Sequence, residues 1–165
     1  MVSGKRLTPT PTPTSRPANL RRAYFDCRYG QLHVRTAFPA GGGFDERATV
    51  VVLHDASVNS ASLLPWLREL GQDRSVYAPD FPGHGESDGP DGVAGEAAAF
   101  AVAAAAVLDL CADLRLRAID LVAVGTAGEV ARRVASARVG LVARVVEVQN
   151  DATVSAVRAH LDGPA

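Results

Sequence analysis

Short apolar runs alternate with segments of helical periodicity from residue 49 to the end of the chain. Residues 49–53 are a β-branched run without a polar face, which is typical of a strand covered on both sides in a parallel sheet. The same reasoning predicts further strands over about residues 75–78, 118–124 and 142–148, and helices over about residues 62–71, 95–113, 128–137 and 151–161. Asp151 is the expected N-cap of the last helix. Alternating strands and helices predict right-handed crossovers and a parallel sheet with helices on both faces.

Two more strands are predicted ahead of this alternation, over about residues 22–28 and 31–38, joined as an antiparallel hairpin at Tyr29-Gly30. The expected fold is therefore a three-layer α/β/α domain over residues 21–165, with a mostly parallel sheet and an N-terminal hairpin. Residues 1–20 contain an alternating Thr-Pro run at positions 8–14 and no apolar repeat. They are predicted to be a disordered tail rather than a signal peptide.

Composition narrows the class of protein without naming a partner. A length of 165 residues with 47% hydrophobic residues fits a single domain that buries a core. A formal charge of -1 gives no net attraction to nucleic acid or to an anionic membrane. Cys27 and Cys111 lie far apart without metal-ligand spacing, so we expect neither a disulfide scaffold nor a metal site. We also expect no cofactor and a cytoplasmic location. Cys111 lies on the apolar stripe of the helix over residues 95–113 and is expected in the core. The alanine-rich run 97–110 is shorter than the roughly 20 apolar residues that span a bilayer.

Two strings of residues carry a resemblance to a known family. Residues 50–54 read VVVLH before a loop of small residues, and residues 76–88 read VYAPDFPGHGESD. The second string resembles the strand and loop of the α/β-hydrolase family, in its esterase, epoxide-hydrolase and haloperoxidase-like branch. Residues 121–128, LVAVGTAG, fall where that family carries its nucleophile elbow. Residues 144–148 and 152–163 resemble its final strand and helix, which implies a shortened hydrolase core without a lid.

The chain departs from the family pattern at the residues that would perform catalysis. The resemblance places Ser, Asp or Cys at the elbow, where this sequence has Gly125. The loop expected to hold the triad histidine is reduced to Gln149-Asn150, and His160 is predicted on the outer surface of a helix. The sequence thus predicts that the nucleophile and the triad histidine are missing.

The loop after residue 53 adds a second departure. It reads His54-Asp55-Ala56-Ser57, so a carboxylate stands beside the backbone N–H groups that the resemblance assigns to a vestigial oxyanion hole, those of Ala56 and Thr126. In one interpretation Asp55 folds into the empty hole and accepts hydrogen bonds from the N–H groups of Thr126 and Ala127. In the other, Asp55 points to solvent or caps its own loop.

Three residues are candidates for a non-standard site, namely Asp55, His84 and Asp80. We expect His84 to be a structural loop residue, with a general-base role as the alternative. Asp80 is expected to accept hydrogen bonds from backbone amides of its own loop. The remaining hydroxyls near the carboxyl ends of the strands have no visible base and are expected to form loop hydrogen bonds: Ser57, Ser60, Ser87 and Thr126.

Three functional hypotheses follow. The first is a hydrolase-like protein without serine-hydrolase activity that acts in binding or assembly, as a homodimer covering an exposed sheet edge. The second is an enzyme on this fold that uses Asp55, His84 or Asp80 for hydrolysis, elimination or proton transfer on a small molecule. The third is a vestigial chain. All three leave room for a small-molecule ligand, and none invokes nucleic acid or a membrane.

Overall fold

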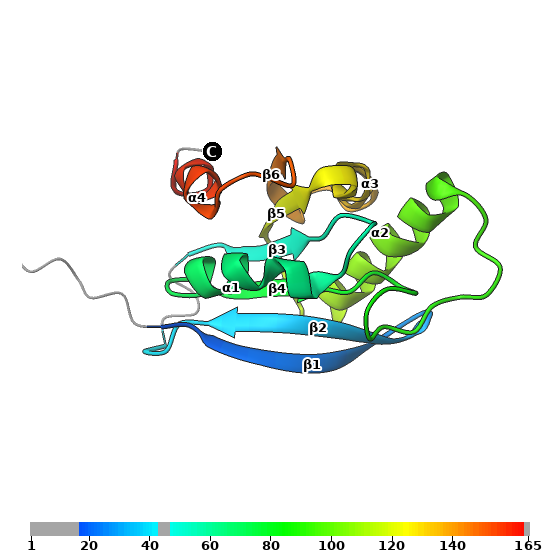
Figure 1. The fold of residues 1–165 in the computed structure, drawn as a ribbon, viewed down its shortest axis with the longest axis horizontal. Helices are drawn as coiled ribbons and strands as arrows, with labels where there is room; N and C mark the ends of the chain where they lie inside the picture. The colour runs from blue at the N-terminus through cyan, green and yellow to red at the C-terminus, as the bar shows by residue number, and fades with distance from the viewer. Residues whose placement is uncertain (1–16, 43–46, 164–165) are drawn as a thin grey trace, which may run out of the picture.

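A six-stranded sheet with helices on both faces forms the centre of the computed structural model, which describes residues 17–42 and 47–163 (Figure 1). The strand order is β1-β2-β4-β3-β5-β6. The strands are β1 (Asn19–Cys27), β2 (Gly30–Phe38), β3 (Thr49–Leu53), β4 (Val76–Pro79), β5 (Ile119–Val124) and β6 (Val142–Val148). The helices are α1 (Leu64–Leu70), α2 (Glu96–Asp113), α3 (Gly128–Ala137) and α4 (Val154–Asp162). This architecture confirms the predicted fold class.

Strands β1 and β2 form the predicted antiparallel hairpin, paired from Asn19 opposite Phe38 to Cys27 opposite Gly30. The first strand begins three residues earlier than expected, because Asn19 and Leu20 continue the pairing. Ala18 also packs against the core beside α1, so the expected tail boundary at residue 20 is wrong for residues 18–20. The Thr-Pro run of the predicted tail lies outside the described residues.

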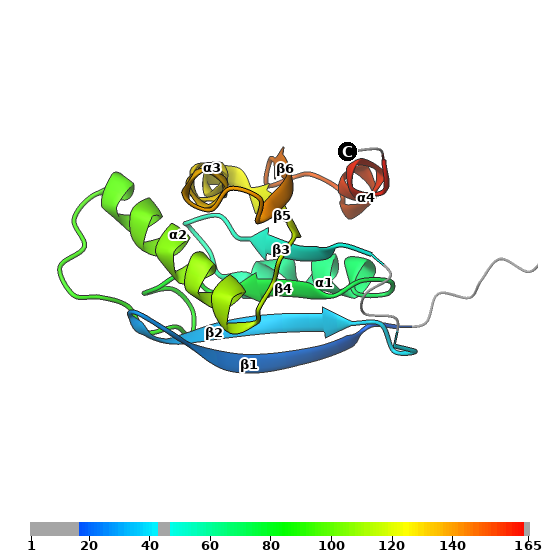
Figure 2. The same cartoon turned by 180° about the vertical axis from the view of Figure 1, so that it is seen from behind.

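The other four strands are parallel to one another, and their two faces carry separate cores. Residues of α2 and α3 cover one face, and residues of α1 and α4 cover the other (Figure 2). Cys111 is a fully buried residue of α2, and this burial raises the pKa of its thiol to about 11. Among the described residues, none of the helices is both long enough and apolar enough to cross a bilayer.

Helix α4 starts later than the sequence predicts. The N-cap is Thr153, whose hydroxyl oxygen accepts from the Ala156 N–H at 3.4 Å, and not Asp151. The reason is a turn at the end of β6, in which the Ala152 N–H donates to the Gln149 carbonyl at 3.1 Å. Residues of this turn cannot join the helix, so the helix begins after it.

A group of ion pairs fastens α4 to the segment before β4. Arg74 is only 2% exposed, and its guanidinium donates to Asp73 at 2.8 Å and to Asp162 at 2.6 Å. Arg158 donates to Asp73 at 2.5 Å, and Arg47 donates to Asp162 at 2.7 Å. Since Arg158 and Asp162 lie on α4, these contacts attach the last helix to the segment that leads into β4.

We predict that Arg74→Met lowers the free energy of unfolding by about 2 kcal/mol, because it leaves two half-buried carboxylates without their shared cation. Urea denaturation of the variant and of the parent measures the loss. The control is Arg68→Met, which removes an exposed arginine of α1 with no ion pair in the described part of the chain. Equal losses for the two variants would contradict the prediction.

Candidate functional site

The carboxyl ends of the parallel strands meet at one edge of the sheet, where the loops after β3, β5 and β6 converge. Gly125 follows β5 directly and has a φ of +58°, in the left-handed region that glycine adopts without strain. Residues Gly125–Ala127 form a short 3₁₀ turn that runs straight into α3. This is the sharp strand-to-helix geometry of a nucleophile elbow, built here around a glycine.

The Asp55 side chain occupies the space in front of this turn. Its Oδ2 accepts from the Thr126 N–H at 2.8 Å and from the Thr126 hydroxyl at 3.0 Å. Its Oδ1 accepts from the Ser57 N–H at 2.9 Å and from the Ser57 hydroxyl at 2.6 Å. A Cβ atom added to Gly125 would lie 2.2 Å from Asp55 Oδ2. The carboxylate therefore stands where a side chain of residue 125 would begin.

Of the two interpretations of Asp55, the structure has the one in which the carboxylate folds into the elbow. One detail of that interpretation is wrong, because the hydrogen bonds to Asp55 among the described residues come from Thr126 and Ser57 and not from Ala127. The Ala56 N–H, the other expected oxyanion donor, donates to the Thr126 hydroxyl at 3.0 Å. Both N–H groups assigned to the hole are thus bonded within the protein.

Hydrogen bonds hold the pKa of Asp55 far below its usual range. The hydroxyl of Ser57 has the largest effect, followed by the N–H groups of Thr126 and Ser57, and together they outweigh the loss of hydration. The start of α3 adds a favourable helix dipole. A carboxylate with so low a pKa is ionised at neutral pH and is a weak base, so it is poorly suited to accept a proton from a substrate.

The two histidines of this edge hold loops together. His54 Nδ1 donates to the Asp55 carbonyl at 2.8 Å, while Nε2 accepts from the Phe81 N–H at 3.0 Å. Burial lowers the pKa of His54, which favours this neutral form. His84 Nε2 lies 3.0 Å from the Ala56 carbonyl oxygen, and Nδ1 lies 3.3 Å from that of Pro82. His160, the histidine after the elbow, is exposed on α4 and contacts the Ala156 carbonyl.

Asp80 is bonded inside the protein rather than in a cleft. Its Oδ1 accepts from the Ser60 N–H at 2.6 Å, and its Oδ2 accepts from the Glu86 N–H at 3.0 Å and lies 2.8 Å from His33 Nδ1. Burial opposes ionisation of Asp80, but hydrogen bonds, those from Ser60 foremost, keep its pKa below the usual value. The His33 and Asp80 side chains are at most 2% exposed. This is the one carboxylate–imidazole ion pair within the described part of the chain, and it lines none of the cavities described below.

Sequence reasoning did not single out His33. It lies on β2 between the buried residues Leu32 and Val34, a position that reads as part of a half-buried strand. The alternation of that strand gives no signal for a partner 47 residues away. The pairing depends on β2 lying beside β4, which only the folded sheet provides.

Two cavities open on either side of Asp55 and Ala56. One, of about 230 Å³, is lined by Asp55, Ser57, Trp66, Val124 and Asn150, among others. The other, of about 280 Å³, is mainly apolar and lies between the loop after β4 and α2, with His84, Phe81, Val93 and Phe100 in its wall. Phe100 in this wall is partly buried and also packs against the core under α2 and α3. Both volumes are near the lower limit for small-molecule sites.

Other polar groups of this edge are used for loop structure. The Ser87 hydroxyl donates to the Asp80 carbonyl at 2.8 Å and accepts from the His33 N–H at 2.9 Å. The Ser60 hydroxyl is buried and has no hydrogen-bond partner among the described residues. Over the described ranges, no group of three or more His, Cys, Asp or Glu side chains has the arrangement of a metal site.

We predict that Asp55→Asn lowers the free energy of unfolding at pH 7 by about 2 kcal/mol, since it removes a charged acceptor of several hydrogen bonds. The folded-state pKa of Asp55 lies below its unfolded value, so its contribution is complete above about pH 4 and declines as the pH falls further. The difference between parent and variant should therefore shrink between pH 7 and pH 2.5 in urea denaturation. A difference that stays constant over this range would show that ionised Asp55 does not stabilise the elbow.

Comparisons with known proteins agree with this geometry. No curated protein matches the chain. Among solved structures, it resembles 2-hydroxy-6-oxo-6-phenylhexa-2,4-dienoate hydrolase from Rhodococcus sp. strain RHA1, with 19% identity and a TM-score of 0.69 over 79% of this chain and 46% of that one. It also resembles a carboxylesterase from Bacillus subtilis, with 20% identity and a TM-score of 0.65 over 79% and 43% of the two chains. An epoxide hydrolase from Vigna radiata has 16% identity and a TM-score of 0.66 over 78% and 38%.

The chain thus spans less than half the length of these three structural relatives. At such low identity, the likeness establishes the fold alone. The family itself is shown by the model of the alpha/beta hydrolase family, which matches residues 50–163, from β3 through the elbow to the end of α4. With its sheet order, its glycine-centred elbow and this match, the chain belongs to the alpha/beta hydrolase family.

Proposed function

We propose that this chain is a non-catalytic member of the alpha/beta hydrolase family that acts through binding and self-association. The observation that carries the proposal is the Asp55 carboxylate on the Thr126 amide. An elbow works when a nucleophile projects from the turn and the neighbouring N–H groups await the oxyanion. In this chain the Asp55 carboxylate fills the space of a side chain at residue 125 and accepts from the Thr126 N–H group. It therefore occupies the position of the nucleophile and uses a donor that an oxyanion would need.

The arrangement around the elbow supports the absence of acyl transfer in three ways. Residue 125 has no side chain, and the Cβ atom of any other residue would collide with Asp55. The N–H groups of Ala56 and Thr126 already donate within the protein. The ring nitrogens of His54 are bonded to the backbone, so neither serves as a free base near the turn.

A second candidate function is proton transfer on a small molecule by His84. The observation in its favour is that His84 lines the apolar cavity of about 280 Å³ at the carboxyl edge of the sheet. The two carboxylates named with it are engaged elsewhere, Asp55 with Ser57 and Thr126, and Asp80 with His33. His84 would then act without a carboxylate to orient it, which makes this function the weaker proposal.

The hydrolytic activities of the structural relatives are not carried over to this chain. They belong to chains of more than twice the matched length. The fold places the elbow in the same position, while the chemistry of a hydrolase depends on the side chains at that position.

We predict that neither the parent chain nor Gly125→Ser is labelled stoichiometrically by a fluorophosphonate probe or hydrolyses p-nitrophenyl acetate above the buffer rate. The Gly125→Ser variant should also lose roughly 1–3 kcal/mol of stability, because serine is strained at a positive φ and meets Asp55. The double variant Gly125→Ser, Asp55→Gly relieves the collision and should remain inactive for want of a base.

The matched control is Asp55→Gly alone, which opens the elbow without adding a hydroxyl. Labelling of any serine in the parent would contradict the non-catalytic proposal. Ester turnover by either serine variant well above this control would also contradict it. If Gly125→Ser is as stable as the parent, the elbow is less constrained than its positive φ implies.

The proposed self-association concerns β6, the last strand of the sheet on the side of the elbow. Among the described strands, β6 pairs only with β5, so one side of its backbone is open for hydrogen bonding. Val145 in the middle of this strand is 37% exposed. A second copy of the chain fits this edge, because two identical strands related by a twofold axis pair in an antiparallel manner and satisfy both backbones.

We predict that the chain is a dimer in light scattering at about 100 μM. Val145→Lys should shift it toward monomer, because it places two like charges close to the shared edge. The control Val58→Lys changes another exposed valine, in the loop after β3, and should leave the dimer intact. A clean monomer at this concentration, or equal effects of the two variants, would refute the β6 interface.

A further inference from the structure

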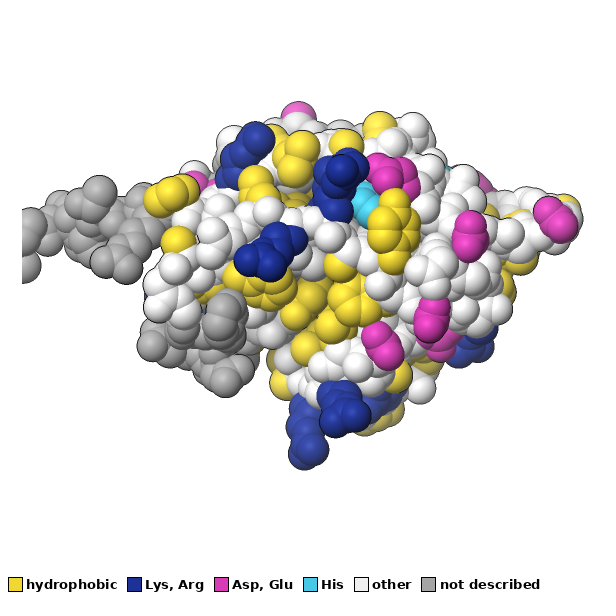
Figure 3. Space-filling model, turned by 90° about the horizontal axis from the view of Figure 1, so that it is seen from below, with side chains coloured by type: hydrophobic (Ala, Val, Ile, Leu, Met, Phe, Trp, Pro, Cys, Tyr) yellow, Lys and Arg dark blue, Asp and Glu magenta, His cyan; other side chains and the backbone are white. Residues whose placement is uncertain are grey.

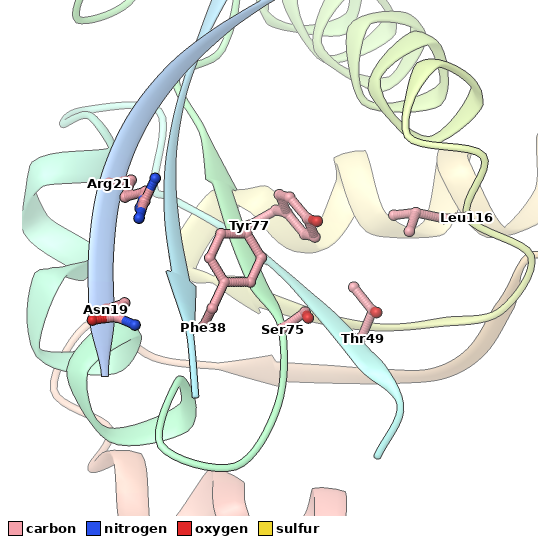
Figure 4. Close-up of a pocket in the computed structure, with 7 residues that line it drawn as sticks. All are labelled: Asn19, Arg21, Phe38, Thr49, Ser75, Tyr77 and Leu116. Carbon is pink, nitrogen blue, oxygen red and sulfur yellow. The ribbon is translucent and has the colours of Figure 1, made fainter. Parts of the chain in front are cut away.

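A third hollow lies at the amino-terminal ends of the parallel strands, away from Gly125, which lies at their carboxyl ends. Thr49 is the first residue of β3, Ser75 precedes β4 and Leu116 precedes β5. The hairpin completes the wall with side chains of β1 and β2 (Figure 4). The hollow has a volume of about 470 Å³, which is within the usual size of a small-molecule site.

Aromatic side chains form its apolar wall. The rings of Phe38 and Tyr77 meet edge to face, with centroids 5.8 Å apart and an interplanar angle of 80°. Leu116 lies across from them, as Figure 4 shows. Such a wall offers a ring edge and a ring face to a flat apolar group, an arrangement that favours an aromatic ligand.

Polar side chains around this wall have no hydrogen-bond partner among the described residues. Ser75 is the most informative, because it is only 6% exposed and its hydroxyl faces the hollow without a bond. The others are Asn19, Arg21, Thr49 and Tyr77. Asn19 and Arg21 are exposed, and Thr49 and Tyr77 are partly buried, so these side chains are available to donate hydrogen bonds to a ligand in the hollow.

The charged residues in the lining of this hollow and of its neighbour are arginines. Arg21 is the charged residue in the lining of the hollow, and no described acidic residue lines it. An adjoining depression shares Leu116 and is lined by Arg115, Arg117 and Arg138, none of which has an ion pair in the described part of the chain. Figure 3 shows the face below the hairpin, where hydrophobic side chains gather in the centre and both basic and acidic side chains lie around them. The arginines in these two linings favour an anionic ligand over a cationic one.

We propose that this hollow binds a small aromatic carboxylate. The ring lies against Phe38, Tyr77 and Leu116, while the carboxylate accepts hydrogen bonds from Arg21 and the hydroxyls of the pocket. A guanidinium donates two parallel hydrogen bonds to a carboxylate, which explains an unpaired arginine at the edge of an apolar slot. The proposal does not depend on the elbow, since the two sites lie at opposite edges of the sheet.

The test is a titration of the full chain with 2-naphthoate, followed by isothermal calorimetry and by amide NMR shifts. We expect saturable binding, with shifts at Thr49, Ser75 and Leu116 and none at Gly125 and Thr126. Arg21→Gln should weaken binding about tenfold, equivalent to 1.4 kcal/mol. The control Arg68→Gln removes an exposed charge of α1 and should change the affinity less than twofold.

Two further measurements keep the proposal falsifiable. The neutral analogue 2-naphthamide should bind at least tenfold more weakly than 2-naphthoate, and Ser75→Ala should weaken binding of the acid without lowering the melting temperature. Absence of saturable binding by both 2-naphthoate and benzoate would overturn the proposal. Equal affinity for acid and amide, equal effects of the Arg21 and Arg68 variants, or shifts confined to the carboxyl edge of the sheet would also overturn it.

Discussion

A helix that starts directly after a buried strand leaves N–H groups pointing toward the end of that strand, and these groups need an acceptor. In this chain the Asp55 carboxylate accepts from Thr126, the second residue after β5. The contact joins the loops after β3 and β5 across 71 residues of sequence. It also explains why residue 125 is glycine, since the carboxylate occupies the space of any Cβ there. The geometry of a hydrolase elbow is thereby kept while its reactive place is filled.

The carboxyl and the amino-terminal ends of the parallel strands consequently differ in the polar groups that they offer a ligand. At the carboxyl edge, the polar groups of Asp55, Asp80 and His54 are bonded within the protein. At the opposite edge, Arg21 and Ser75 face a larger hollow without partners in the described chain. We therefore propose ligand binding at the end of the strands away from the elbow, while the hydrogen bonds of the carboxyl edge hold its loops together.

The local pattern of apolar and polar residues was sufficient to predict most of the strands and helices. The β-branched run of β3 and the bounds of α3 and β6 followed from periodicity, because these segments are buried on one or both faces in a regular way. The beginning of α4 did not, since the turn after β6 overrides a favourable N-cap at Asp151. The start of β1 was missed because polar Asn19 is held by pairing with β2 rather than by its own preference.

The candidate site was only partly predictable for a different reason. The position of Gly125 at the elbow followed from the motif, and Asp55 folded into the elbow was one of two open interpretations. The choice between them depends on an amide brought close by the fold, as does the His33–Asp80 pair. The hollow at Arg21 joins segments from β1, β2, β3, β4 and β5, so no sequence window contains it. The most direct measurement is an NMR titration of the Asp55 side-chain carboxyl carbon. The account predicts a midpoint well below the ordinary aspartate value of about 3.9, and a midpoint near that value would contradict a carboxylate held on the elbow.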